Sequence, residues 1–400
     1  MFALTQEHRM VQKAVRDFAE KEILPNVEAL DGGEILPFDL IKKLMKQVLA
    51  ADFLAESLEN RARALEAGRK PEESGRGFDP LIPSLILKEL SRISPGLCMS
   101  WAVSVGLCGN NIRDRGTPDQ IRRFAIPVMC GDKIGAWALT EPEAGSDAFG
   151  SMKTTAQPVD GGYVLNGSKT FITNGPHADI LLCYAKVDRG GEEATRPVNA
   201  FILTRGMKGL STGPAFKKMG MKDSPTGEVF LDNVFVPAAN LLGGREKTEG
   251  RAEVRKSLGG ERSGICPMCL GIVERCYELS VKYAKKRRQF GRPIAEFQAV
   301  QVKVANMYIH LQNLWNAVFR LAEMDRQKTP DPAYICASKV YAARAAVEVS
   351  LDAIQIHGGY GYMAEFHVEK LMRDAKLLEI GAGTTDINLL TTARLELGLL

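Results

Sequence analysis

The spacing of the hydrophobic positions changes twice along the chain and divides it into three parts. In about the first 135 residues, apolar side chains recur at the spacing that places them on one face of a helix, as at Val11, Ala14, Val15 and Phe18. Residues 53–70 have the same spacing, with charged residues on the opposite side. The pattern predicts an N-terminal helical domain over residues 1–135.

The middle part has short apolar runs separated by Gly, Pro and Asp. Residues 161–175 predict two strands joined by a turn at Asn166-Gly167, because Asn-Gly suits the positive φ angles of a tight hairpin. The runs DILLCYAKV, VNAFILTRG and GEVFLDNVFVP predict further strands. We therefore expect a middle β domain over residues 136–250, built as a barrel or a sandwich.

The last part, residues 251–400, returns to helical spacing in long segments. Helices are predicted over 261–286, about 296–327, 333–356 and 365–378, with a final one from Thr384. Long helices with short joints containing Gly or Pro favour an antiparallel four-helix bundle. The predicted fold class is thus α+β, with a helical domain, a β domain and a helical bundle.

Composition narrows the function classes. The chain has 400 residues, of which 45% are hydrophobic and 25% charged, and this is typical of a globular protein of two or three domains. A net charge of only +4 argues against a nucleic-acid partner. No apolar run reaches the ~20 residues of a membrane span, and the N-terminus lacks a basic-then-apolar signal sequence. We expect a cytoplasmic protein, or a mitochondrial matrix protein if the source is eukaryotic and the chain is processed.

The cysteines favour structural roles. The chain has eight, mostly within apolar segments, which predicts free buried thiols rather than a disulfide framework. Cys266 and Cys269 have the C-x-x-C spacing of redox or zinc sites, but no second pair or nearby His completes a four-ligand set. Both also lie on an apolar helical stripe, so we predict no metal site.

Three polar motifs are ambiguous when each is taken alone. The run LTEPEAGSD offers N–H and hydroxyl groups to a ligand, but by itself it is typical of a turn. The basic cluster KKRR favours a solvated helix end or a nucleic-acid patch. The run HGGYGY follows a helix rather than a strand, so it is not a dinucleotide-binding fingerprint, and His357 is predicted to be a loop residue rather than a base.

Taken together, five motifs in this order resemble the acyl-CoA dehydrogenase family of flavoenzymes, from about residue 5 to residue 397. They are residues 137–150, 171–175, 287–298, 355–376 and the loop LLEIGAGTTDIN at 377–388. The resemblance implies the acyl-CoA dehydrogenase fold, FAD as cofactor, an acyl-CoA substrate, electron-transfer flavoprotein as oxidant and a homotetramer.

The resemblance also implies which residues bind FAD. Those expected around the flavin are Trp137, Leu139, Thr140, Ser146, Phe171, Thr173, Thr384 and Asp386. Those expected to hold the pyrophosphate and adenosine are Arg287, Gln289, Phe290 and Gln298, with Gln355, Gly358 and Gly359 reaching the same cofactor from a neighbouring subunit. The family usually has Trp where this chain has Phe171, so the ring is kept and an N–H donor is lost.

The expected reaction removes a proton from Cα of the acyl thioester while a hydride leaves Cβ, so it needs a carboxylate base in a dry pocket. Many members of the family carry a Glu where this chain has Ala382. One branch, the isovaleryl-CoA dehydrogenases, instead combines a Gly-Ala-Gly-Thr loop with a helix Glu-Arg pair, as here at Glu261 and Arg262. The alternative for Glu261 is an acid in the first turn of a helix, favoured by the macrodipole. The change at Ala382 favours the catalytic role.

The other expected substrate contacts lie near these residues. Ser146 and Arg262 would reach the CoA moiety, Ala382 would offer its N–H to the thioester carbonyl, and Gly381 and Gly383 would shape the pocket. Gly381 stands where many relatives have Tyr, which favours a short branched or bulky acyl group.

Other functions on the same fold stay open: an enoyl-CoA reductase, a decarboxylating or cyclic-acyl-CoA dehydrogenase, or more remotely a DNA-binding relative. An insertion at residues 53–70 could reshape the acyl pocket.

Overall fold

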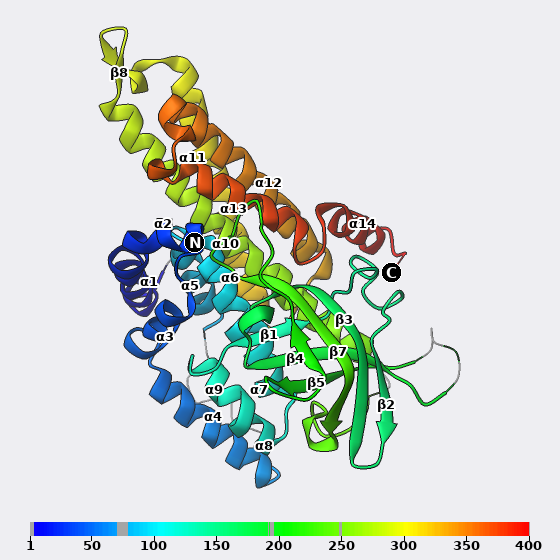
Figure 1. The fold of residues 1–400 in the computed structure, drawn as a ribbon. Coiled ribbons are helices and arrows are strands. Elements are labelled where there is room, and N and C mark those ends of the chain that lie inside the picture. The colour runs from blue at the N-terminus through cyan, green and yellow to red at the C-terminus, as the bar shows by residue number, and fades with distance from the viewer. Residues whose placement is uncertain (1–3, 70–78, 191, 193–195, 248–249, 400) are drawn as a thin grey trace.

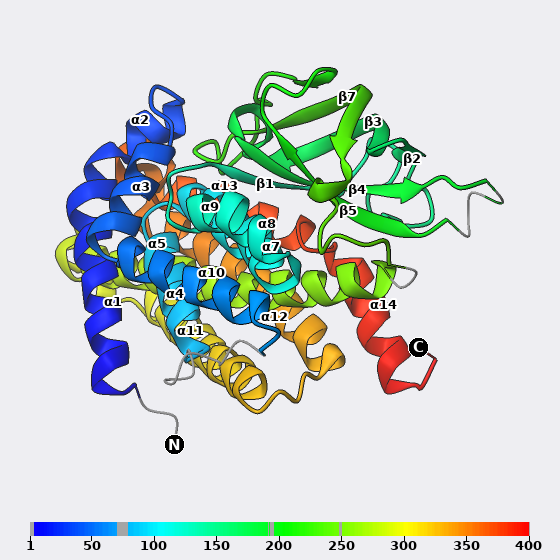
Figure 2. The same cartoon turned by 90° about the horizontal axis from the view of Figure 1, so that it is seen from below.

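The computed structural model describes residues 4–69, 79–190, 192, 196–247 and 250–399. A group of helices, a curled β-sheet and a second group of longer helices follow one another along the chain (Figure 1). The sheet lies beside the helices rather than between them (Figure 2). The predicted three-part α+β organisation is confirmed.

Two of the N-terminal helices, at Gln6–Phe18 and Ala51–Glu66, match the predicted apolar spacing. Helix α1 is capped by Thr5, whose hydroxyl accepts from the His8 N–H, and it buries Val15 and Phe18. The α-helices of this part are α1 (Gln6–Phe18), α2 (Val27–Gly32), α3 (Phe38–Gln47), α4 (Ala51–Glu66), α5 (Leu81–Ser91), α6 (Pro95–Trp101), α7 (Asn110–Arg115), α8 (Pro118–Gln120) and α9 (Ile126–Met129). Wider π-helical turns join several of them, at Ala19–Ile23 (η1), Ala102–Gly109 (η3) and Ile121–Ala125 (η4).

The middle part is a seven-stranded sheet in the order β1-β4-β2-β3-β7-β6, with β5 paired to β4. The strands are β1 (Gly135–Ala138), β2 (Thr155–Val159), β3 (Gly162–Thr173), β4 (Ile180–Val187), β5 (Val198–Thr204), β6 (Leu210–Thr212) and β7 (Thr226–Pro237). Strands β3 and β7 form the longest antiparallel pair, with Thr173 opposite Thr226 at one end.

The predicted hairpin at Asn166-Gly167 is wrong. These residues lie inside the continuous strand β3, at an irregularity in its pairing with β7. Glycine is needed at 167 for a different reason: a Cβ there would lie 2.8 Å from the Thr154 Cα, and φ is +145°. The tight turn comes earlier, at Asp160-Gly161 between the paired residues Val159 and Gly162.

The C-terminal helices are long, and four of the five lie within three residues of their predicted bounds. They are α10 (Gly250–Lys286), α11 (Gln298–Arg326), α12 (Pro332–His357), α13 (Val368–Ile380) and α14 (Thr385–Glu396). The prediction for the first one is wrong at its start: α10 begins at Gly250 rather than at residue 261, so Glu261 is not in its first turn. Helix α10 has 37 residues and therefore spans ~55 Å. Two short strands, β8 (Arg288–Gln289) and β9 (Arg292–Pro293), follow it at the end of the molecule that we call the tip (Figure 1).

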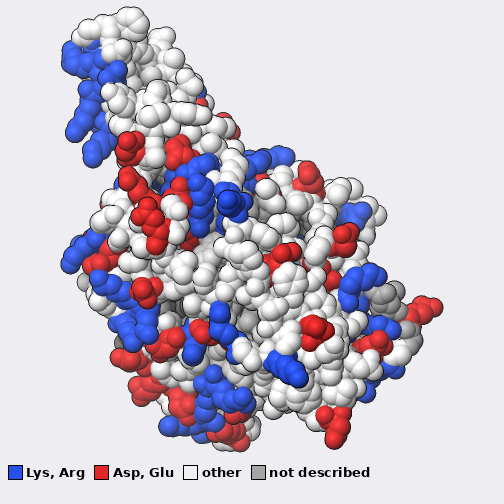
Figure 3. Space-filling model, viewed as in Figure 1, with Lys and Arg blue, Asp and Glu red and all other residues white. Residues whose placement is uncertain are grey.

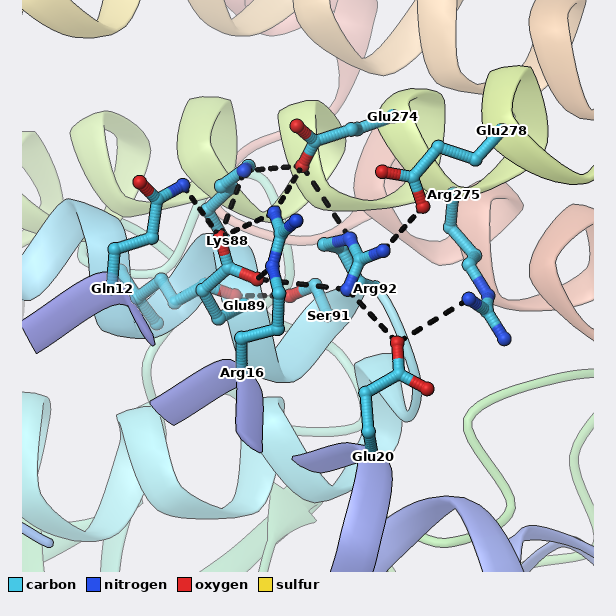
Figure 4. A network of polar contacts seen from close by, with 11 residues as sticks. Gln12, Arg16, Glu20, Lys88, Glu89, Ser91, Arg92, Glu274, Arg275 and Glu278 are labelled. Atoms are coloured by element: carbon cyan, nitrogen blue, oxygen red, sulfur yellow. Dashed lines mark hydrogen bonds and ion pairs between the residues drawn. The ribbon is translucent and has the colours of Figure 1, made fainter. Parts of the chain in front are cut away.

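Buried ion pairs join the N-terminal helices to α10. Lys88 and Glu89 of α5 are fully buried and pair at 2.8 Å. Arg16 of α1 donates to the Glu89 carboxylate at 2.8 Å, and Lys88 also pairs with Glu274 of α10. Figure 4 shows these side chains converging from the three helices. Because each buried charge has partners, the network fixes α10 against the first helical domain.

A second buried network joins all three parts. Asp223, in the loop before β7, accepts from Ser94 at the start of α6 and pairs with Lys370 of α13 at 3.3 Å. Lys370 also pairs with Asp374 at 2.6 Å, and Asp374 accepts from the Met221 N–H of the same loop. The network sets where the end of β3 and the end of α13 lie relative to each other.

The cysteine prediction agrees with the structure. All eight cysteines are free and buried. Burial raises the pKa of the Cys266 thiol to about 12 and that of Cys269 well above its usual value, so neither is poised for redox chemistry. The described residues contain no cluster of three or more metal-ligating side chains. None of the described helices is long and apolar enough to cross a bilayer.

Candidate active site

The loop Gly381–Thr384, between α13 and α14, is held by side chains from three helices. Arg262 Nε of α10 donates to the Ala382 carbonyl at 3.3 Å. Lys339 Nζ of α12 donates to the carbonyls of Gly383 at 2.8 Å and Glu379 at 3.2 Å. Asn388 Nδ2 of α14 donates to the Gly383 carbonyl at 2.7 Å. The carbonyl groups of the loop thus point toward the protein.

The backbone of this loop is unusual. Ala382 is in the left-handed region at φ +55°, which costs a non-glycine residue about 1 kcal/mol. Gly383 is at φ +81°, and a Cβ there would lie 3.2 Å from Asn388 Nδ2. Among the hydrogen bonds of the described residues, none has the Ala382 N–H as its donor. The strained turn therefore leaves the Ala382 N–H able to bind a ligand's carbonyl oxygen.

Glu261 lies near this loop, because its carboxyl group is affected by the charges of Arg262 and Lys339, and both of these residues contact the loop. The Glu261 side chain is half-buried, and loss of solvent raises the pKa of its carboxyl to about 7, although the positive charges of Arg262 and Lys339 oppose the rise. A carboxyl group that titrates near neutral pH is suited to general-base catalysis. The structure thus brings together the two sequence changes expected to compensate each other.

Lys339 and Asn388 escaped the sequence analysis. Both are buried and donate to the loop. One signal was available for Lys339: it occupies the same helix face as Cys336, Val340 and Ala343, all buried. A lysine within such an apolar stripe is uncommon and needs a partner. Asn388 carried no comparable signal, because asparagine in the first turn of a helix is ordinary.

The residues expected around the flavin gather at the ends of β1 and β3. The Thr170 N–H donates to the Thr140 carbonyl at 2.9 Å, and Lys169 Nζ donates to the Leu139 carbonyl at 3.2 Å. The acid of the LTEPEAGSD motif, Glu141, is buried and pairs with Lys169 at 2.7 Å. Its role is therefore to join the two strands rather than to exchange protons.

The side chains of this wall leave polar and aromatic groups available. Trp137 is half-buried, and its Nε1 donates to the Tyr184 hydroxyl at 3.0 Å. Phe171 is 69% exposed at φ +56°, and Thr173 follows it. An open aromatic ring and hydroxyls fit the polar edge and flat face of a flavin.

The remaining expected contacts of the flavin and substrate are at loops or helix starts. Ser146 is exposed in the turn after β1. Thr384 caps α14, where its hydroxyl accepts from the Ile387 N–H at 3.2 Å, and Asp386 is exposed in the first turn of that helix.

The residues expected to hold the pyrophosphate and adenosine lie at the tip. Arg287, Gln289, Gly358 and Gly359 line one cavity of about 470 Å³ together with Tyr283 and Met363. Phe290, Gln298 and Gln355 are exposed in the same region, Phe290 to 92%. Lys and Arg side chains gather at this end (Figure 3). Open glycines and cationic side chains fit a pyrophosphate group.

His357 is not a loop residue as predicted. It ends α12, where it is buried, and its ring lies 4.4 Å from that of Tyr283. Burial lowers the pKa of its imidazole, which fits a neutral packing residue.

The two groups of FAD residues are far apart within one chain. Between Glu261 and Lys286, which immediately precedes Arg287, helix α10 runs for 25 residues, or about 38 Å. This separation exceeds the length of an extended FAD. Moreover, the sequence analysis assigned Arg287 and Gly358 to different subunits, whereas they line the same cavity.

The site combines a carboxyl group whose pKa is about 7 with a backbone N–H that donates no hydrogen bond among the described residues. A wall suited to a flavin lies next to them. This combination fits an enzyme that removes a proton adjacent to a carbonyl group and passes electrons to a bound cofactor. Family models agree over nearly the whole chain. The acyl-CoA dehydrogenase N-terminal domain matches residues 5–132, the middle domain residues 136–234 and the C-terminal domain residues 248–397. The chain belongs to the acyl-CoA dehydrogenase family of FAD-dependent oxidoreductases.

Individual relatives differ in their named substrates. An acyl-CoA dehydrogenase of Bacillus subtilis (strain 168) is 38% identical over 99% of both chains. A mitochondrial isovaleryl-CoA dehydrogenase of Oryza sativa subsp. japonica is 36% identical over 98% of this chain and 91% of that protein. A 3-(aryl)acrylate reductase of Clostridium sporogenes is 35% identical over 97% of this chain and 98% of that protein.

Solved structures share the whole fold. The butyryl-CoA dehydrogenase of Megasphaera elsdenii has a TM-score of 0.87 and 34% identity, covering 99% of this chain and 100% of that chain. A chain in a structure described as the electron transferring flavoprotein of Acidaminococcus fermentans has a TM-score of 0.87 and 35% identity, covering 99% of both chains.

The raised pKa of Glu261 predicts a pH-dependent stability gain in Glu261→Gln. Above the usual carboxyl pKa of 4.5, the unfolded chain releases this proton while the folded wild type keeps it until about pH 7. The wild type therefore loses stability as pH rises from about 5 to 7, and the variant does not. We expect equal thermal midpoints at pH 5 and a higher midpoint for the variant at pH 8, by circular dichroism. A difference that does not change with pH would contradict the raised pKa.

Proposed function

We propose that the protein dehydrogenates a short branched or bulky acyl-CoA thioester to the 2-enoyl-CoA, with Glu261 as the base. The contact between Arg262 and the Ala382 carbonyl carries this proposal, because it fixes the Glu-Arg pair of α10 against the loop that lacks a carboxylate of its own.

The chain's own residues account for the proton step. The Glu261 carboxylate, poorly solvated and therefore basic, takes the proton from the substrate Cα. As negative charge develops on the thioester oxygen, the Ala382 N–H donates to it, and removal of one such donor typically lowers a rate by ~10²–10³-fold. Two cations, Arg262 and Lys339, lie close to the developing charge. FAD, when bound, accepts the hydride that leaves Cβ.

Gly381 supports the proposed acyl group. Its φ is an ordinary −69°, and a Cβ built there would approach only the Leu377 carbonyl, at 3.6 Å. Since neither the backbone nor close packing requires glycine, its effect is to leave room beside the loop. A role of residues 53–70 in shaping the acyl pocket has less support than that of Gly381, because α4 packs on α8, η4 and α9.

The tip supports the proposed homotetramer. The tip residues are too far from Glu261 to hold the same FAD, so they would serve the cofactor of a second copy of the chain. Phe290 and Tyr362, 92% and 79% exposed, give this end apolar surface that a second copy could cover. Electron-transfer flavoprotein is the proposed oxidant, and the free buried thiols are compatible with the cytoplasm or another reducing compartment.

A second candidate is the reverse reaction, reduction of an enoyl or arylacryloyl thioester. The similarity to a 3-(aryl)acrylate reductase favours testing it. The same base and the same loop would then return a proton to Cα.

Glu261→Gln tests the base directly. We expect the purified variant to keep FAD but to lose acyl-CoA-dependent bleaching of flavin absorbance by several orders of magnitude, because the amide cannot accept the Cα proton. Anaerobic stopped-flow absorbance measures this. Glu348→Gln, which neutralises an exposed acid of α12, is the control and should bleach normally. Normal bleaching by Glu261→Gln would overturn the assignment.

Gly381→Tyr tests the pocket. We expect kcat/KM for isovaleryl-CoA to fall at least tenfold relative to butyryl-CoA, because the ring would fill the space beside the loop. Steady-state assays with electron-transfer flavoprotein should include cyclic and aryl-substituted acyl-CoAs, and enoyl-CoA reduction should be assayed alongside. A wild type that favours straight chains, or a variant with unchanged preference, would contradict the proposed substrate class. Failure of electron-transfer flavoprotein to reoxidise the bleached enzyme would contradict the proposed oxidant.

Arg287→Ala tests the tip. We expect this variant to lose most of its FAD on gel filtration, because a phosphate-binding charge is removed from the cavity. The ratio of absorbance at flavin and protein wavelengths measures the loss. Arg292→Ala changes an arginine of the same tip that stacks on Phe297 at 4.3 Å, and it should keep FAD. Full FAD retention by Arg287→Ala would contradict a cofactor site at the tip.

A further inference from the structure

Lys339 of α12 is a buried lysine directed at the candidate site. Its side chain is fully buried. Its ammonium group donates to the carbonyls at the two ends of the active-site loop, Glu379 and Gly383, at 3.2 and 2.8 Å. A lysine inside a protein is costly unless its charge is compensated. Backbone carbonyls satisfy two of its hydrogen bonds, but they do not neutralise its charge.

Burial lowers the pKa of Lys339, and the positive charge of Arg262 adds to this effect. The groups that oppose it are Cys269, Glu261 and Glu379. Those that act on Glu261 are Arg262 and Lys339. Because the Glu379 carboxylate pairs with Lys376 on its own helix, Glu261 is the acid left to balance the lysine.

We propose that Lys339 is a positioning residue of the reaction: its ammonium group holds the Gly381–Thr384 loop so that the Ala382 N–H faces the substrate, and its charge favours the anionic form of Glu261. The inference rests on the proposed role of Glu261 as base. It adds a residue from α12 to the pair on α10.

The two effects of Lys339 are separable in principle. As a donor, Lys339 holds the Gly383 carbonyl, to which Asn388 also donates. As a charge, it opposes the desolvation that raises the pKa of Glu261 to about 7. An opposite charge within ~4–6 Å typically lowers a carboxyl pKa by 1–3 units. Without the lysine, a smaller fraction of Glu261 would be ionised at neutral pH.

Lys339→Met tests the charge. In anaerobic single-turnover experiments with the FAD-loaded protein, we expect the pH midpoint of flavin bleaching to move up by about one unit. At pH 7 the smaller ionised fraction of Glu261 should lower the rate about fivefold, and the rate should recover toward high pH except for the part lost through the looser loop. Lys339→Arg, which keeps the charge, should keep the wild-type midpoint.

Asn388→Ala is the matched variant for the loop alone. It removes a donor to the Gly383 carbonyl without changing any charge. We expect it to slow bleaching at every pH while the midpoint stays at the wild-type value. If Lys339→Met does not fold, Lys339→Gln replaces it, since it also lacks the charge.

A readout that needs no catalysis distinguishes this inference from the base assignment. In the Lys339→Met background, the gain in thermal midpoint from Glu261→Gln should keep growing up to a higher pH than in the wild-type background. The reason is that the pKa of Glu261 is raised further there. Suppose that Glu261→Gln is inactive but that Lys339→Met leaves the pH midpoints of bleaching and of the stability gain unchanged. The role of Lys339 is then overturned and the base assignment stands. The same conclusion follows if Lys339→Arg shifts these midpoints as Lys339→Met does. If Glu261→Gln bleaches normally, the base assignment is overturned.

Discussion

The hydrogen bonds from Arg262, Lys339 and Asn388 to one short loop are the constraint on which the site depends. They come from three different helices and donate to the carbonyl groups of Glu379, Ala382 and Gly383. With its carbonyl held toward the protein, Ala382 keeps a left-handed conformation that alanine seldom adopts, and its N–H donates no hydrogen bond among the described residues. The surrounding packing thus maintains a local strain of about 1 kcal/mol that the isolated segment would release.

The same arrangement explains how a loop without an acid can belong to an active site. In the proposed reaction the carboxylate comes from α10, and the loop supplies the donor and the space. Glu261 is basic because it is poorly solvated, yet the cations Arg262 and Lys339 keep it ionisable near neutral pH. The balance between desolvation and charge, rather than any single contact, sets the reactivity of the base.

Helix α10 connects this site with the rest of the molecule. Its middle is fixed to the first domain by the buried network of Glu274, Lys88 and Glu89, shown in Figure 4. Its far end carries the tip, about 38 Å from Glu261. The proposed base lies near one end of this helix, and the proposed cofactor cavity lies beyond the other end. A single chain would therefore contribute part of two different FAD sites, one at each end.

Much of this could be predicted from the sequence, for identifiable reasons. The helices followed from long apolar periodicity, and the base followed from two compensating changes, Ala382 and Glu261. The hairpin at Asn166-Gly167 failed because a close approach of Thr154, invisible to local patterns, required the glycine. Lys339 escaped because its partners are backbone carbonyls more than 35 residues away along the chain, and only the fold brings them together.

The central claim is that the Glu261 carboxylate removes the proton from Cα, and Glu261→Asp tests it most directly. That variant keeps the carboxylate but withdraws it by one methylene. We would measure single-turnover flavin bleaching with an acyl-CoA that is bleached by the wild type, unlabelled and deuterated at Cα. The account predicts intact FAD binding, bleaching slowed about 100-fold by the misplaced base, and a deuterium effect at least as large as in the wild type. Bleaching at the wild-type rate, or without any deuterium effect, would contradict it.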